Sequence, residues 1–261
     1  MRRAVAGRMM AIGGVALLWA GSAQAQFQLP DKFTNLKVLP KDISKEDLIR
    51  TMRGWSGALG VRCDQCHEEA PPGTRPDFAS DTRWEKRAAR DMVRMVAALN
   101  GDYLAHLEAR PASATTPTSA ALHVECVTCH RGLPRPETID SVVAGVLAKD
   151  GVDAAIGKYK ELRERYLTSG SYDFSDRPLN ALGERLLGEG KGGEALAFLK
   201  VDTELNPSSG SAAYLLGDAK LATGDRDGAK DAFEKSLALD PRNPRARRKL
   251  EELKAAPSPK P

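Results

Sequence analysis

The four cysteines of the chain constrain it more than any other feature, because they form two copies of one short pattern. Each copy has two cysteines separated by two residues and followed directly by a histidine, and no cysteine is left over. The copies are Cys63-Asp64-Gln65-Cys66-His67 and Cys126-Val127-Thr128-Cys129-His130. This spacing is typical of a site where a c-type haem is attached covalently. We therefore expect two haems, one on each motif.

The attachment chemistry explains why these residues recur at this spacing. Two thiols on one tight turn can each add to a vinyl group of the porphyrin, and the histidine that follows is then held beneath the iron as its proximal ligand. The thioether bonds are expected at Cys63, Cys66, Cys126 and Cys129, and the proximal iron ligands at His67 and His130.

Three other interpretations of paired cysteines are weaker for this chain. A redox dithiol of the thioredoxin type is expected within a βαβ unit, and no strand-like alternation flanks either motif. A zinc site would have to combine two pairs that lie about 60 residues apart, each with its own histidine. Ordinary disulfides are common in exported proteins but do not require the following histidines.

The first 25 residues have the pattern of a secretory signal peptide. Arg2, Arg3 and Arg8 precede an apolar run that is too short to span a bilayer, and Ala23-Gln24-Ala25 offers a cleavage site. Export agrees with haem attachment, which proceeds outside the cytoplasm, so we expect a periplasmic protein without a membrane span. Cleavage would lower the net charge from +4 to about +1, and no basic stripe with interleaved aromatic residues suggests nucleic-acid binding.

The sixth iron ligand decides between electron transfer and small-molecule chemistry. A helix is predicted from the capping residue Ser44 to Gly60, with Met52 on its apolar face. A second helix is predicted from about Trp84 to Leu99, starting near Asp81 and with its methionines pointing inward. A methionine on an apolar face is often simple core packing. The candidate ligands beyond the two motifs are Met52, Met92, Met95, His106 and His123.

The stretch from Leu36 to Leu133 resembles half of the tetrahaem cytochrome subunit of purple-bacterial photosynthetic reaction centres. In that family, a helix with a ligand methionine precedes each of the first three haem motifs. The matching features are Met52 eleven residues before Cys63, the run Leu59-Gly60-Val61, the run Arg90-Asp91-Met92-Val93-Arg94-Met95 ending at Asn100, and Cys126 to Gly132.

The resemblance implies which residues complete the two iron sites. It makes Met52 the sixth ligand of the haem on the first motif and Met92 that of the second, with Met95 in reserve. His106 matches a histidine that in the tetrahaem relatives ligates a haem of the other half, which this chain lacks. His106 is therefore either an idle polar residue, a partner of a haem propionate or a competitor of Met92.

The C-terminal half repeats with a period of 34 residues, which is the tetratricopeptide period. Gly183 recurs as Gly217, and Pro207 recurs as Pro241. Helices around Ala154 to Tyr166 and from Asn243 to Ala255 are expected to cap the array. Stacked helical hairpins of this kind leave a groove that commonly binds a protein partner, although the array could also only pack on the haem module or form a dimer.

These patterns together predict an all-α protein with a di-haem c-type cytochrome module followed by a short helical-repeat module. The expected boundaries are a signal peptide at 1–25, the haem module at 26–136, the repeats at 137–256 and a disordered tail at 257–261. The expected function is transfer of single electrons between a donor and an acceptor protein. A di-haem peroxidase or a haem-based sensor is the alternative, and either would need an open or labile iron position.

Overall fold

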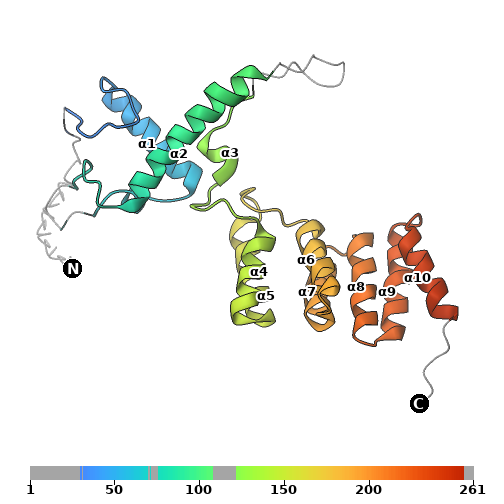
Figure 1. The fold of residues 1–261 in the computed structure, drawn as a ribbon. Coiled ribbons are helices and arrows are strands. Elements are labelled where there is room, and N and C mark those ends of the chain that lie inside the picture. The colour runs from blue at the N-terminus through green and yellow to red at the C-terminus, as the bar shows by residue number, and fades with distance from the viewer. Residues whose placement is uncertain (1–29, 31, 70, 72–75, 108–121, 256–261) are drawn as a thin grey trace, which may run out of the picture.

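The computed structural model describes residues 30, 32–69, 71, 76–107 and 122–255, and these form ten α-helices and no β-strand (Figure 1). The all-α prediction is therefore confirmed. The expected signal peptide at 1–25 and the tail at 257–261 lie outside the described residues. Within the described part of the chain, no helix combines the length and the apolar character that a membrane crossing requires.

The first helix, α1 (Lys45–Leu59), begins and ends as the sequence predicts. The Ser44 side chain accepts a hydrogen bond from the backbone N–H of Asp47, which satisfies one of the free donors of the first turn. Gly60 ends the helix in the left-handed conformation, with φ of 64°, where glycine avoids the steric cost of a side chain. The helix thus stops three residues before the first motif.

The second helix, α2 (Trp84–Ala98), continues into a π-helical turn at Leu99–Tyr103. The expectation that Met92 and Met95 point into the protein is wrong for the polypeptide alone, because they are 42% and 45% exposed. The one buried residue of this helix is Arg90. The described part of the chain leaves the methionine face of α2 open.

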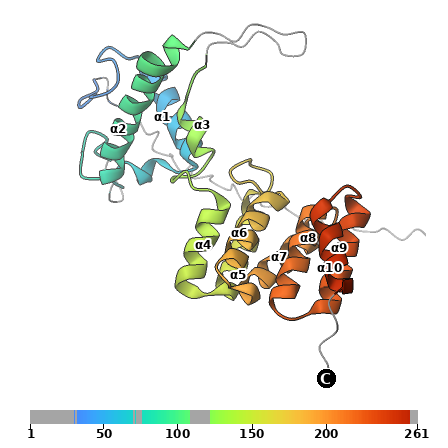
Figure 2. The same ribbon diagram turned by 45° about the vertical axis from the view of Figure 1, so that its right-hand side comes forward.

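The third helix, α3 (Cys126–His130), is a single turn that packs against α1 (Figures 1 and 2). The backbone N–H of Gly132 donates a 2.9 Å hydrogen bond to the carbonyl of Ala58. A side chain at Gly60 would collide with the carbonyl oxygen of Gly132. The helix leading into the first motif is therefore joined to the turn that follows the second motif.

The remaining helices stand side by side in a row (Figures 1 and 2). The sequence predicted one leading helix near Ala154, but the structure has a pair before the first repeat. The missed member, α4, carries a short apolar run interrupted by Gly145 rather than a clear helical period. The helices of the row are α4 (Ile139–Asp150), α5 (Val152–Tyr166), α6 (Asp176–Gly188), α7 (Gly192–Leu205), α8 (Gly210–Ala222), α9 (Arg226–Leu239) and α10 (Pro244–Ala255).

Equivalent glycines explain part of the 34-residue period. A side chain at Gly183 would collide with Leu199, and one at Gly217 would collide with Phe233. In each repeat the first helix therefore needs a glycine where a large residue of the second helix crosses it. Leu199 and Phe233 are fully buried, which makes these crossings the centre of the repeat core.

Candidate functional site

The first motif forms one tight turn that brings its two thiols and its imidazole together. Cys63–Gln65 form a short 3₁₀ helix. The backbone N–H groups of Cys66 and His67 both donate to the carbonyl of Cys63, over 3.2 and 3.0 Å. Cys63 is exposed, whereas Cys66 and His67 are half-buried. The turn has the local geometry that attachment of a porphyrin to two thiols requires.

The second motif forms the single turn of α3, which is fixed at both ends. At its start, Glu125 and Thr128 make a reciprocal capping box, in which the backbone N–H of Glu125 donates a 3.0 Å hydrogen bond to the Thr128 hydroxyl. At its end, Arg131 adopts a left-handed conformation with φ of 48°, and Gly132 follows with φ of 83°. The chain thus turns away directly after His130.

The imidazole of His130 is oriented by the backbone. Its Nδ1 lies 2.8 Å from the carbonyl oxygen of Leu133, and the residue Leu133 is only 3% exposed. A hydrogen bond at Nδ1 leaves Nε2 to coordinate a metal, and ligand histidines in proteins are commonly held in this way. His130 therefore has the orientation that a proximal haem ligand needs.

His67 lies in a different environment. Its ring packs edge-on against Phe78 at 4.9 Å between centroids, and its Nδ1 is buried without a hydrogen bond of normal geometry. Burial lowers the pKa of His67, and the nearby charges of Lys86 and Arg90 lower it further. The imidazole is therefore neutral at pH 7, which is the form that binds a metal.

The thiols do not have the properties of a redox dithiol. Burial raises the pKa of both Cys66 and Cys126 above the ordinary value. Reactive cysteines instead have lowered pKa values that favour the thiolate. All four cysteines are unpaired, and within the described ranges no three His, Cys, Asp or Glu side chains converge to hold a metal ion.

The region around the motifs leaves large apolar side chains uncovered. Trp84, Met92 and Met95 of α2 are 64%, 42% and 45% exposed, and Val127 within the second motif is 47% exposed. Exposed apolar surface of this extent usually marks a binding site. Together with the oriented imidazole of His130 and the neutral imidazole of His67, it fits the flat apolar macrocycle of a haem.

The other candidate ligands lie at separate places. Met52 is half-buried on α1, while Met92 and Met95 lie one turn apart on α2. His106 is exposed at the end of the short turn Leu104–His106, and His123 is exposed just before the second motif. Their assignment as axial ligands stays a prediction.

The sequence analysis missed a group of charged residues beside His67, which we name the Asp81 cluster: Asn35, Lys37, Asp81, Lys86 and Arg90. Asp81 lies 2.7 Å from both Lys37 and Arg90 and 3.5 Å from Lys86. Asn35 donates a 2.9 Å hydrogen bond to the same carboxylate. Asp81 was predicted as a residue near the start of α2, but no pattern in the sequence shows that it binds residues more than 40 positions away.

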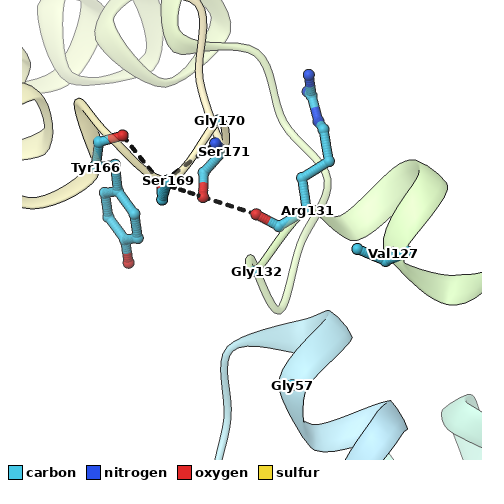
Figure 3. Close-up of a pocket in the computed structure, with 8 residues that line it drawn as sticks. All are labelled: Gly57, Val127, Arg131, Gly132, Tyr166, Ser169, Gly170 and Ser171. Carbon is cyan, nitrogen blue, oxygen red and sulfur yellow. Dashed lines mark hydrogen bonds between the residues drawn. The ribbon is translucent and has the colours of Figure 1, made fainter.

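The turn after the second motif also contacts the helical repeats (Figure 3). The Ser171 hydroxyl is buried and donates a 2.7 Å hydrogen bond to the carbonyl of Arg131. Ser169 bonds to Ser171 and to the carbonyl of Tyr166. A cavity of about 390 Å³ lies at this junction, lined by Gly57, Val127, Arg131, Gly132, Tyr166, Ser169, Gly170 and Ser171.

Two family models match the chain. The model of the photosynthetic reaction centre cytochrome C subunit matches residues 20–182, a range that contains both motifs. A tetratricopeptide repeat model matches residues 186–253.

The chain is also similar to individual proteins over part of its length. Cytochrome c-554 of Chloroflexus aurantiacus is 32% identical over 113 residues, which are 43% of this chain and 24% of that protein. The photosynthetic reaction center cytochrome c subunit of Rubrivivax gelatinosus is 31% identical over 115 residues, which are 40% of this chain and 30% of that protein. The chain therefore matches less than a third of these relatives.

Among solved structures, the chain is similar to the second TPR domain of human RPAP3, determined in complex with an HSP70 peptide. That similarity has a TM-score of 0.33 and 21% identity, and it covers 45% of this chain and 93% of that domain.

Proposed function

Because the chain belongs to the photosynthetic reaction centre cytochrome C subunit family, we propose that it is a periplasmic di-haem cytochrome that passes single electrons between two proteins. The observation that carries this proposal is the pair of C-x-x-C-H turns, each with its thiols on one turn and its histidine in a form that can bind iron. The haem iron supplies a one-electron ferrous/ferric couple.

The residues of the chain have separate roles in this proposal. Cys63 and Cys66 hold one haem, and Cys126 and Cys129 hold the other. Nε2 of His130 would bind the iron, because the Leu133 carbonyl occupies Nδ1. His67 stays neutral in its buried position and binds the other iron.

Met52 and Met92 are the proposed sixth ligands, with Met95 and His106 in reserve. A thioether ligand favours the reduced state and fills the position that a peroxidase or a gas sensor keeps open. The exposure of Met92 suits this role, because the side chain is available to a group that covers the open face of α2.

The repeats are proposed to dock a partner protein and so raise its local concentration at the haems. Charged side chains of α6, α8 and α10 meet across the array. Arg245 lies 3.5 Å from Glu184 and stacks 4.6 Å above the Tyr214 ring, and Lys249 lies 3.7 Å from Asp218. The Arg245–Glu184 pair is exposed, so a partner can exchange it for an ion pair of its own at little cost. The haem module is proposed to end near residue 136.

The proposal is tested on the mature protein from a host that attaches c-type haems. We expect the acid-denatured chain to keep its pigment and to exceed the bare polypeptide by the mass of two haems. The matched control is the double variant Cys126→Ser with Cys129→Ser, which should carry one haem. A chain without bound pigment would contradict the proposal.

Carbon monoxide separates a carrier from the enzyme and sensor alternatives. The reduced protein should resist carbon monoxide, because both axial positions of each iron are filled. Rapid binding at either iron would instead favour the peroxidase or the sensor.

A further inference from the structure

The Asp81 cluster lies directly beside the proximal histidine of the first motif. The His67 ring contacts the Phe78 ring, and the Phe78 carbonyl accepts a 2.7 Å hydrogen bond from the Lys86 ammonium group. The same ammonium group donates 2.6 Å to the carbonyl of Ser80. Phe78 thus contacts both the ammonium group of Lys86 and the proposed iron ligand His67.

The cluster carries more positive than negative charge. Lys37, Lys86 and Arg90 surround the single carboxylate of Asp81, so the net charge is +2. The hydrogen bond from Lys37 is the main reason that the pKa of Asp81 lies far below its usual range, and the carboxylate stays ionised at neutral pH. Arg90 is 8% exposed and is the only buried basic residue in the part of the chain that the structure describes.

Acidic residues near the first motif do not cancel this charge at the histidine. Glu85 raises the pKa of Cys66, but Arg83 opposes it there. Asp77 lies close enough to act on Lys86, and its carboxylate accepts the backbone N–H groups of Ala79 and Ser80. The charges that act on His67 itself are those of Lys86 and Arg90, and both are positive.

Among the described residues, no comparable group of ion pairs lies beside the second motif. His130 is oriented by a neutral carbonyl, and the charge that acts on the Cys126 thiol besides the neighbouring Cys129 is that of Glu125, which is negative. Arg131 is exposed to solvent, which screens its charge. The two motifs are therefore alike in sequence, but only the first has a buried cation, Arg90, acting on its histidine among the described residues.

We infer that the Asp81 cluster raises the reduction potential of the haem on the first motif above that of the second, so that electrons collect at the first. Oxidation adds a positive charge at the iron, and a buried cation disfavours that charge more strongly than an exposed one. The inference rests on the proposed function and gives it a direction.

The test uses two variants of opposite sign in the full-length haem protein. Lys86→Gln removes a positive charge and should shift the ferrous/ferric ratio of the first haem about tenfold toward the ferric form, a fall of about 59 mV for one electron. Asp81→Asn removes the negative charge and should raise the same potential. Spectroelectrochemical titration measures both potentials, and the second should not move in either variant.

Opposite shifts of the first potential in the two variants identify an electrostatic effect, because local unfolding would shift this potential in the same direction in both. The control is Lys158→Gln, which removes a charge on α5 and should leave both potentials unchanged. The double variant Cys126→Ser with Cys129→Ser assigns the remaining potential to the first motif. If the protein binds two haems but neither Lys86→Gln nor Asp81→Asn changes a reduction potential, this inference alone is overturned. A chain without haem would overturn the proposed function.

Discussion

The haem-motif region and the helical repeats differ in how each fills its interior. Between Lys32 and Leu133, the described residues bury only Leu48, Ala58, Arg90 and Leu133. The repeats instead share one continuous apolar core, whose largest fully buried members are Tyr159, Phe198, Phe233, Ile139, Leu179, Leu182, Leu186 and Leu199. The haem-motif region therefore has too few buried side chains to form a core of its own, whereas the repeats fill their core with their own side chains.

The glycines of the two regions also have different roles in packing. In the repeats, Gly183 and Gly217 make room for Leu199 and Phe233, so that each glycine permits apolar burial. In the haem-motif region, Gly60 and Gly132 bring two backbone segments together. There the close contact positions two motifs rather than building a core.

Loss of the proposed haems should have the largest predicted effect, and it should destabilise the haem-motif region but not the repeats. With all four motif cysteines changed to serine, we expect residues 32–133 to lose their protection against hydrogen exchange, because the few buried side chains cannot offset the conformational entropy of that region. The repeats should stay protected. The measurement is hydrogen exchange followed by mass spectrometry on the full-length variant. An equal loss of protection in α6 to α9 would show that the repeats depend on haem as much as the haem-motif region does.

Truncation of a side chain in the repeat core should instead destabilise the repeats and leave the haem-motif region unchanged. Phe233→Ala removes a fully buried ring that packs against Tyr214 and Gly217. We expect it to lower the free energy of unfolding of the repeats by about 3–5 kcal/mol. Urea unfolding followed by circular dichroism measures this loss, while the haem absorption spectrum should not change.

A matched control lies on the same helix. Leu239 ends α9 and is 39% exposed, so Leu239→Ala should cost far less stability than Phe233→Ala. If the two variants were equally destabilised, the repeat core would not have the density that its burial indicates.

Patterns along the chain predicted those features that depend on neighbours in sequence. The start of α1 at Ser44 and its end at Gly60 follow from local capping chemistry, and the 34-residue period predicted the hairpins that contain Gly183 and Gly217. The open methionine face of α2 was not predicted, because a period shows that residues share a face but not what covers it. The Asp81 cluster was missed because ion pairs between residues 35–37 and 81–90 leave no periodic signal.

The last predicted effect is a pH dependence of stability that differs between the two regions, because two aspartates have pKa values shifted in opposite directions. Asp81 has a lowered pKa, mainly because of its hydrogen bond from Lys37. Asp202 of α7 is fully buried, and burial raises its pKa to about 7. Its Oδ1 accepts a 2.7 Å hydrogen bond from Asn206, whereas Oδ2 has no partner.

Stability of the repeats should therefore fall as the pH rises from about 4 to about 7, and the decline should level off above pH 7. The folded repeats hold a proton on Asp202 that the unfolded chain releases near its ordinary pKa of 3.8, so raising the pH favours unfolding, by at most about 1.4 kcal/mol per pH unit. Asp81 has the opposite effect in the haem-motif region, where its contribution to stability is lost as the pH falls below its ordinary pKa. Urea unfolding at pH 5, 6, 7 and 8 should show the decline in the chain and not in Asp202→Asn, because the amide cannot ionise. An equal decline in that variant would assign the pH dependence to another group and leave Asp202 as an ordinary buried hydrogen-bond acceptor.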